Sequence, residues 1–422
     1  MALSALETLT AEITGLGRPI DEKAMLDWQL SKIRGAMRRA AERNSRYAER
    51  FRDVDIDSIR TLDDYAVVPF TYPEELTDNA VSFVCEPERN ISRITSLRTS
   101  GSTGAPKRVY FTDNDLNRTI RLFELGMRPV IGGDGSRCLI IMSDSTPGSL
   151  ASLLKEGVER SGFPAKIYGT IRDFSDAAKS VRNGDAIVGI PWQMLRLCRE
   201  HPELRPASVL LSADYVPSPV PDAIRSAWKC RVYTHYGLTE TCFGCAVQCG
   251  EHSAHHIRHD CLLIEIINPE SGRRLDFGEE GEIVITAFLN EAMPLFRYRT
   301  GDISSLENGL CECGSVLPRL RAVKGRLKNR ITIDGKTFSI ETMDDVLYAL
   351  PELWQYEASF KCRLDKNALK ITAVGPKSLN IAEIYAVVSS VLPKDIEIIV
   401  EKGKNFEEIK KRRIECIWHG EE

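Results

Sequence analysis

The chain of 422 residues has no apolar run of the roughly 20 residues that a membrane-spanning helix needs. Its apolar stretches at residues 139–142 and 208–216 have only the length of buried strands. The N-terminus has no basic region and carries Glu7 early, so it does not resemble a signal peptide. These absences predict a cytoplasmic protein without a membrane partner.

The sequence also lacks an excess of charge of one sign, internal repeats and low-complexity segments. Its 56 basic and 60 acidic residues give a net charge of −4, which predicts no nucleic-acid partner. Hydrophobic residues make up 43% of the chain, enough for a large core. The length predicts two or three domains.

Strands and helices are predicted to alternate in the first half of the chain. Proline at position 191 fits the first turn of a helix. The predicted helices cover residues 22–52, 150–161 and 191–201, and the predicted strands cover residues 137–142, 186–190, 208–213 and 230–233. This alternation is typical of an α/β sheet with helices packed on it.

The pattern changes in the second half. β-branched runs at residues 262–267 and 282–286 predict a smaller, more antiparallel subdomain. From Gly325 onward, short strands and two helices predict a compact α+β unit. The expected architecture is therefore an α/β domain over residues 1–324 that includes a β-rich subdomain, followed by a small α+β domain over residues 325–422.

The clearest motif is the string TSGSTGAPK at residues 99–107. Glycine lets the backbone turn closely around an anion, successive N–H groups can bind it, and Lys107 adds a positive charge. The motif differs from an NTPase P-loop because no Gly-Lys-Ser/Thr follows. The residues expected to contact phosphate are Thr99, Ser100, Gly101, Ser102, Thr103, Gly104 and Lys107.

This string resembles the phosphate loop of the adenylate-forming superfamily, which includes acyl-CoA synthetases, nonribosomal peptide adenylation domains and luciferases. YGLTE at residues 236–240 and YRTGD at residues 298–302 resemble two further motifs of that superfamily. Gly325 and Arg326 resemble its hinge motif, and residues 409–413 weakly resemble its C-terminal lysine motif. The motifs occur in the order that the superfamily has.

Longer stretches narrow the resemblance to the phenylacetate–coenzyme A ligase family: residues 61–71, 265–272 and 294–302. The resemblance covers nearly the whole chain. It implies ATP-dependent adenylation of a small carboxylic acid, an aromatic one in that family. Transfer of the acyl group to a thiol would follow, with coenzyme A as the expected acceptor. It also implies that the C-terminal domain is mobile.

The resemblance assigns roles that the chemistry of the side chains supports. Tyr236 can stack on adenine, and Glu240 is a hard carboxylate suited to Mg²⁺ on the ATP phosphates. Asp302 can accept both ribose hydroxyls, and Arg326 can donate to ribose or phosphate. Beyond the phosphate loop, the implied nucleotide-binding residues are Ala213, Asp214, Tyr236, Gly237, Thr239, Asp302 and Arg326.

The implied catalytic residues are Lys107, Glu240 and Lys410. The family uses a C-terminal lysine while the acyl-AMP forms, and a cation there stabilises the charge that develops. In this chain Ile409 stands where the family has glycine, so Lys404 and Lys411 compete with Lys410 for the role. The hinge also departs from the family, which has acidic residues where residues 328–329 are Lys and Asn.

Six of the twelve cysteines fall between residues 242 and 313. In a reducing compartment they are not expected to form disulfides. Some phenylacetate ligase relatives bind structural zinc through corresponding residues, here Cys249, His256, Cys311 and Cys313. Four such ligands form a closed tetrahedral site. Buried free thiols are the alternative. His252, His255 or His259 could replace His256, and Cys242, Cys245, Cys249 and Cys261 could instead form an iron–sulfur site.

Two other functions stay open on the sequence alone. One is an adenylyltransferase that stops at the acyl-AMP or passes AMP to a cofactor. The other is a non-catalytic nucleotide-binding regulatory protein, against which the intact phosphate-binding and carboxylate residues argue. The sequence leaves the oligomeric state open, with a homodimer as one candidate.

Overall fold

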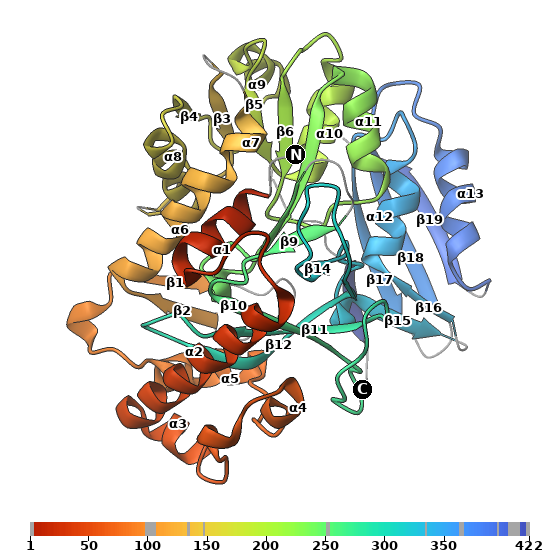
Figure 1. The fold of residues 1–422 in the computed structure, drawn as a ribbon. Helices are drawn as coiled ribbons and strands as arrows, with labels where there is room; N and C mark the ends of the chain where they lie inside the picture. The colour runs from red at the N-terminus through yellow and green to blue at the C-terminus, as the bar shows by residue number, and fades with distance from the viewer. Residues whose placement is uncertain are drawn as a thin grey trace.

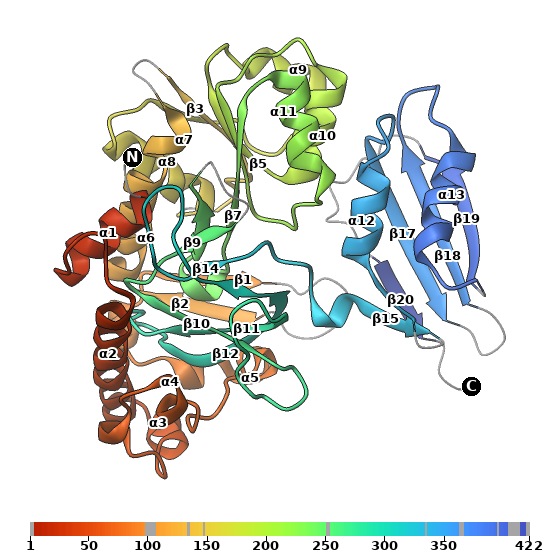
Figure 2. The same cartoon turned by 45° about the vertical axis from the view of Figure 1, so that its right-hand side comes forward.

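The computed structural model describes residues 4–97, 107–132, 136–146, 148–249, 254–333, 336–362, 367–394, 396–403 and 414–418. It has mixed α/β architecture, as the alternating pattern predicts. In Figure 2 the N-terminal helices (red) lie against a β-rich layer, the central α/β region (yellow to green) lies above it, and the C-terminal unit (blue) lies to one side. No helix among these residues is long and apolar enough to span a membrane.

The largest sheet has nine strands in the order β13-β14-β9-β8-β7-β6-β5-β3-β4. Its parallel strands β7, β6, β5, β3 and β4 fill one half, and β8, β9, β14 and β13 continue it in antiparallel pairs. The parallel strands are β3 (Cys138–Ile141), β4 (Ala165–Ile167), β5 (Ala186–Gly189), β6 (Ser208–Leu211) and β7 (Arg231–Tyr236). The others are β8 (Ala246–Gln248), β9 (His255–Ile257), β13 (Leu306–Glu307) and β14 (Arg319–Leu320).

Helices cover both faces of this sheet, which explains why its central strands are apolar throughout. On one face, Ile140, Val188 and Leu210 pack against helices α6 (Asp113–Gly126) and α8 (Leu150–Arg160). On the other face, the intervening strand residues pack against α9 (Phe174–Ser180), α10 (Pro191–Glu200) and α11 (Pro219–Trp228). Figure 1 shows these helices flanking the strands.

The β-rich layer confirms the predicted antiparallel subdomain. Strands β10 (Leu262–Ile267), β11 (Gly281–Ala287) and β12 (Leu295–Ser304) form one antiparallel sheet, and β1 (Arg93–Leu97) pairs with β2 (Lys107–Phe111) in another. The N-terminal helices pack against it and against α6. They are α1 (Ala5–Thr14), α2 (Glu22–Arg43), α3 (Ser45–Arg50), α4 (Leu62–Tyr65) and α5 (Pro73–Asn79).

The prediction of a single helix over residues 22–52 is wrong in one respect. The chain leaves helical geometry at Asn44, whose φ is −142°. The Asn44 side chain then accepts hydrogen bonds from the N–H groups of Arg46 and Tyr47, which starts α3. Asparagine favours this capping geometry over a helix interior, so it divides an otherwise continuous apolar pattern.

The C-terminal unit has a four-stranded sheet in the order β19-β18-β17-β20. The sheet strands are β17 (Gln355–Cys362), β18 (Asn367–Val374), β19 (Ile396–Lys402) and β20 (Ile414–Trp418), with the helices α12 (Ile340–Tyr348) and α13 (Ile381–Val391) and the hairpin β15 (Arg330–Ile333) and β16 (Lys336–Ser339). β17 and β20 were not predicted. β20 pairs in parallel with β17, a long-range contact that local pattern does not reveal.

Polar contacts hold the C-terminal unit against the central region. The hydroxyl of Tyr215 lies 3.2 Å from both carboxylate oxygens of Asp345, and the N–H of Ser218 donates to Asp345 at 2.7 Å. Arg199, on α10, donates to the Tyr348 carbonyl at 2.7 Å. The unit is therefore docked directly beside the segment that follows β6.

Candidate active site

Two of the predicted site residues, Ala213 and Tyr236, lie where parallel strands end. Ser212 and Ala213 follow β6, and Tyr236 is the last residue of β7. β7 pairs in parallel with β6 on one side and antiparallel with β8 on the other, so the sheet changes direction here. Ligands of open α/β sheets bind outside the carboxyl ends of the parallel strands. Ala213 has a φ of 69°, which turns the chain sharply at this edge.

A buried polar cluster joins three segments of the chain. Nζ of Lys107, at the start of β2, donates to Glu240 at 2.5 Å and to the hydroxyl of Tyr298 at 2.8 Å. The Tyr298 hydroxyl in turn donates to the same Glu240 oxygen at 2.8 Å. Burial alone would raise the pKa of Glu240, but Lys107 and the hydrogen bonds hold its pKa below the ordinary value. Glu240 is therefore an anion that is almost inaccessible to bulk water.

A second cluster lies around Asp302. The Tyr236 hydroxyl donates to one carboxylate oxygen at 2.9 Å, and Nε of Arg326 donates to the other at 2.7 Å. Burial raises the pKa of Asp302, which Arg326 and Tyr236 partly counteract. Asp302 and Arg326 also form an isolated β-bridge, so the backbone after β12 fixes the arginine beside the carboxylate.

The structure thus brings Lys107, Tyr236, Glu240, Asp302 and Arg326 into two adjoining clusters. Among the other predicted nucleotide-binding residues, Ala213 is exposed, Asp214 is half-buried, and Thr239 lies in the short helix η4 (Thr239–Thr241). A Cβ on Gly237 would come within 2.0 Å of the Phe243 carbonyl oxygen, which explains the glycine. The predicted residues that lie outside the described part of the chain are Thr99, Ser100, Gly101, Ser102, Thr103, Gly104 and Lys410.

Sequence reasoning missed a role for Tyr298. The residue was noted only as the first letter of a motif, whereas its hydroxyl connects Lys107 with Glu240. The sequence signal was available, because a tyrosine whose hydroxyl is buried usually has a polar partner. The identity of that partner depends on the fold, since Tyr298 and Lys107 are 191 positions apart.

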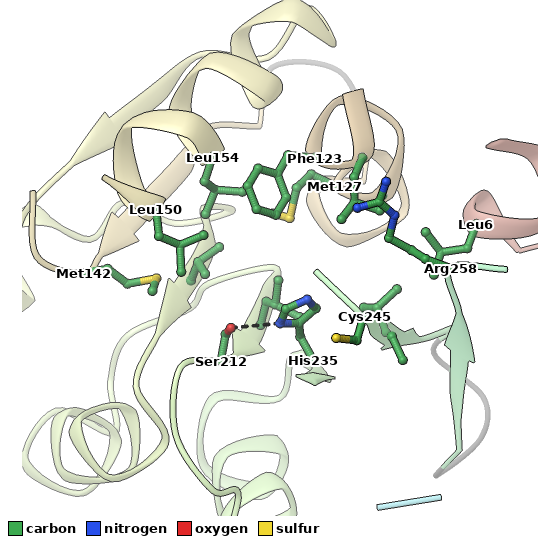
Figure 3. A pocket seen from close by; sticks show the side chains of 16 residues that line it. Leu6, Phe123, Met127, Met142, Leu150, Leu154, Ser212, His235, Cys245 and Arg258 are labelled. Atoms are coloured by element: carbon green, nitrogen blue, oxygen red, sulfur yellow. Dashed lines mark hydrogen bonds between the residues drawn. The ribbon is translucent and has the colours of Figure 1, made fainter. Parts of the chain in front are cut away.

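An apolar cavity adjoins these clusters on the side of α6 and α8. Its volume is about 50 Å³, and its lining is almost entirely apolar. Leu154, Phe123 and Met127 lie across the cavity from Ser212, His235 and Cys245 (Figure 3). The remaining lining residues are Leu6, Leu122, Gly126, Met142, Leu150, Val188, Leu210, Ala246, Val247 and Arg258.

The cavity and the nucleotide-binding residues share backbone segments. Ser212 directly precedes Ala213, and His235 directly precedes Tyr236. The N–H of Cys245 donates to the Tyr236 carbonyl at 3.1 Å. A molecule in the cavity would therefore lie one residue away from the groups predicted to hold the nucleotide.

The four predicted zinc ligands also converge. The ligand atoms of Cys249, His256, Cys311 and Cys313 all lie within 4.8 Å of one another. Nε2 of His256 is 3.5 Å from both Cys311 Sγ and Cys313 Sγ, and the Sγ atoms of Cys249 and Cys311 are 3.7 Å apart. A tetrahedral zinc with ordinary bond lengths separates sulfur from nitrogen by about 3.6 Å and two sulfurs by about 3.8 Å. The donor set and its spacing therefore fit zinc.

The alternative ligands fit less well. Nε2 of His255 is 2.7 Å from the Thr234 hydroxyl, and Nε2 of His259 is 3.0 Å from the Pro318 carbonyl. His252 lies outside the described residues. Within the described chain, Cys242, Cys245 and Cys261 belong to no group of candidate ligands for a single metal ion, and Cys249 lies with His256, Cys311 and Cys313 instead.

Comparisons with known proteins identify what this chain resembles. The family model described as AMP-binding enzyme matches residues 94–287. The phenylacetate-coenzyme A ligase of Thermus thermophilus is 27% identical over 342 residues, which cover 76% of this chain and 75% of that protein. The enzyme of the same name from Pseudomonas putida is 28% identical over 347 residues, covering 77% and 76%.

Solved structures support the fold. A 2-hydroxyisobutyryl-CoA ligase in the postadenylation state, in complex with 2-HIB-AMP, superposes with a TM-score of 0.77 at 17% identity. The alignment covers 92% of this chain and 88% of that one. The same ligase in the thioesterification state gives 0.64.

The fold and the site define a chain that resembles the adenylate-forming, AMP-binding enzymes. Within that class it resembles the phenylacetate-coenzyme A ligases over about three quarters of its length.

Proposed function

We propose that the protein is an AMP-forming acid–coenzyme A ligase. It would adenylate a small carboxylic acid with ATP and transfer the acyl group to the thiol of coenzyme A. The observation that carries the proposal is the pair of buried polar clusters around Glu240 and Asp302, set beside an apolar cavity at the carboxyl ends of parallel strands.

The chemistry needs no protein nucleophile. In the first step a carboxylate oxygen of the acid attacks the α-phosphorus of ATP, and the bond to pyrophosphate breaks. In the second step the thiolate sulfur attacks the acyl carbon, and AMP leaves with the electron pair of the former acyl–oxygen bond. The protein contributes position and charge neutralisation.

The chain's own residues fit these requirements. Asp302, held by Tyr236 and Arg326, presents a fixed carboxylate suited to the ribose hydroxyls. Lys107 can donate to a phosphate oxygen from its place beside Glu240. Mg²⁺ bound with ATP would neutralise phosphate charge, and Glu240 is the carboxylate that fits it.

The C-terminal residues are assigned by the same proposal. Residues 325–422 would form the mobile domain and residues 1–324 the adenylation domain. Lys410 would bridge the acid carboxylate and the α-phosphate during adenylation. The proposal includes a rotation of this domain between the two steps.

We also propose that Cys249, His256, Cys311 and Cys313 bind one structural zinc ion. Support comes from the fit of the donor spacing to tetrahedral coordination. The ion would join Cys249, which follows β8, and His256, in β9, to the two cysteines that follow β13. A cytoplasmic location and a homodimer stay predictions.

Acid-dependent exchange of labelled pyrophosphate into ATP, measured over a panel of carboxylic acids, tests the first step. Product analysis with and without coenzyme A tests the second. Exchange without thioester would indicate an adenylyltransferase. Absence of exchange with every acid would contradict the enzymatic proposal and favour a regulatory nucleotide-binding protein.

A further inference from the structure

The cavity beside the nucleotide-binding residues is apolar on one side and polar along one edge. Leu154, Phe123 and Met127 form the apolar side, whereas Ser212 and His235 lie along the opposite edge (Figure 3). Apolar walls select for a hydrophobic body, and a small number of placed polar groups fix its orientation. The polar edge is therefore the part of the cavity that can distinguish one acid from another.

His235 is the unusual residue on that edge. Its Nδ1 lies 3.1 Å from the Ser212 hydroxyl, which fixes the ring plane. Its Nε2 is buried and has no hydrogen-bond partner among the described residues. A buried polar atom without a partner costs stability, roughly 1–3 kcal/mol, so such an atom at a cavity points to a ligand.

The charge state of His235 restricts that ligand. Burial, with smaller contributions from His255 and Arg258, lowers the pKa of His235 to about 4, so the ring is neutral at physiological pH. Arg258 also lines the cavity, and its Nε has no hydrogen-bond partner among the described residues, but NH2 of its guanidinium lies 3.4 Å from Asp260, which compensates its charge. A neutral ring beside a compensated ion pair favours a ligand that carries an uncharged polar group over a ligand that carries a second carboxylate.

The contact with Ser212 further restricts which uncharged polar group the ligand can carry. If the Ser212 hydroxyl donates to Nδ1, Nε2 carries the proton and donates to the ligand. If Nδ1 donates to Ser212, Nε2 accepts from the ligand. A hydroxyl group can meet either requirement, whereas an ether or ketone oxygen can only accept.

We propose, on the basis of the proposed function, that the acid adenylated by this protein carries a hydroxyl group on its apolar body and that His235 recognises this hydroxyl through Nε2. His235 is then a specificity-determining residue. Activation of the carboxylate stays with the clusters around Glu240 and Asp302.

The test compares acids of matched shape. Phenylacetate, the ortho, meta and para hydroxyphenylacetates, and the corresponding methyl and carboxy derivatives are assayed for kcat/KM in pyrophosphate exchange. At least one hydroxy acid is expected to exceed both phenylacetate and its own methyl counterpart by about 10- to 100-fold, the effect of one buried hydrogen bond.

Variants then test whether His235 causes the preference for a hydroxy acid. In His235→Leu, the ratio of kcat/KM for the hydroxy acid to kcat/KM for the methyl acid is expected to fall close to one. The change is expected chiefly from a higher KM for the hydroxy acid. His235→Gln is expected to retain part of the ratio, because its amide nitrogen can reach the position of Nε2. Leu154→Ala, on the opposite wall, enlarges the cavity without touching the polar edge and should change both acids by similar factors.

The outcomes separate the two proposals. Exchange without a preference for any hydroxy acid, or an unchanged ratio in His235→Leu, overturns this inference and leaves the ligase assignment intact. A preference for a carboxy derivative overturns it in favour of Arg258. No exchange with any acid removes the ligase assignment and this inference together. If His235→Leu does not fold, imidazole ¹⁵N NMR of the wild type decides, since a bound hydroxy acid must shift the Nε2 resonance of His235.

Discussion

The residues proposed to bind the nucleotide, called the nucleotide end from here on, differ from the cavity proposed for the acid. The two regions differ in whether their buried polar groups have hydrogen-bond partners. At the nucleotide end, Lys107 and Glu240 pair with each other, and Asp302 pairs with Arg326. In the cavity, Nε2 of His235 is buried without a partner among the described residues. A site that already pairs its own charges can be shared by enzymes that act on many acids. The unpaired group is where one acid can be distinguished from another.

The strongest test of this comparison removes a charge from the nucleotide end. Glu240→Gln and Asp302→Ala are each expected to lower adenylation of every acid by about 10³-fold or more, because the first loses the carboxylate proposed for Mg²⁺ and the second loses the carboxylate proposed for the ribose hydroxyls. Pyrophosphate exchange measures the loss, and thermal melting checks that each variant is folded. Near-normal turnover in a folded variant of either kind would remove that residue from the site.

Lys410→Ala sharpens the comparison by separating the two reaction steps. Formation of the acyl-AMP is expected to fall by about 10²- to 10³-fold, whereas transfer from a supplied acyl-AMP to coenzyme A stays nearly intact. Rapid-quench measurement of each half-reaction distinguishes these effects. Lys404→Ala and Lys411→Ala are the matched controls, and a larger effect in either would transfer the role to that lysine.

Tyr298→Phe removes one hydroxyl from the buried cluster. It should lower kcat/KM by about tenfold for all acids alike, because one hydrogen bond to Glu240 and one to Lys107 are lost together. A change in the preference among acids would instead mean that the nucleotide end and the cavity are not independent. The acid panel used for His235→Leu provides the direct comparison.

Cys311→Ser addresses stability rather than either end of the site. We expect about one zinc per chain in the wild-type protein and a markedly lower zinc content with a lower melting temperature in the variant. Preference among acids should stay the same. Elemental analysis of protein purified without chelator checks the metal, and wild-type protein without zinc would contradict the assignment.

The smallest expected effect concerns pH. The pKa of His235 is about 4 in the folded protein and 6.5 ordinarily, so its contribution to stability is present above pH 6.5 and is lost as the pH falls toward 4. His235→Gln removes this proton uptake. The slope of unfolding free energy against pH between 6.5 and 4 should therefore decrease by up to about 1.4 kcal/mol per pH unit. An identical slope in both proteins would show that His235 is not buried as described.

Much of the fold follows from local pattern. The strand at residues 262–267 and the proline-started helix at 191 were predicted within a residue or so, because continuous apolar runs and proline act locally. The break at Asn44 was missed because the capping hydrogen bonds formed by a side chain compete with an apolar pattern that continues on both sides. β20 was missed because its partner β17 is more than fifty residues away.

The sequence by itself determined the class of chemistry, because the phosphate-loop, YGLTE and YRTGD motifs each carry their residues in a short, ordered string. It also named the four candidate metal ligands whose donor atoms converge in the structure. Only the tertiary structure decided which groups meet: Lys107 with Tyr298, Ser212 with His235, and Cys249 with Cys311. These pairs lie 191, 23 and 62 positions apart, and their distances depend on how sheets and helices pack rather than on any local preference.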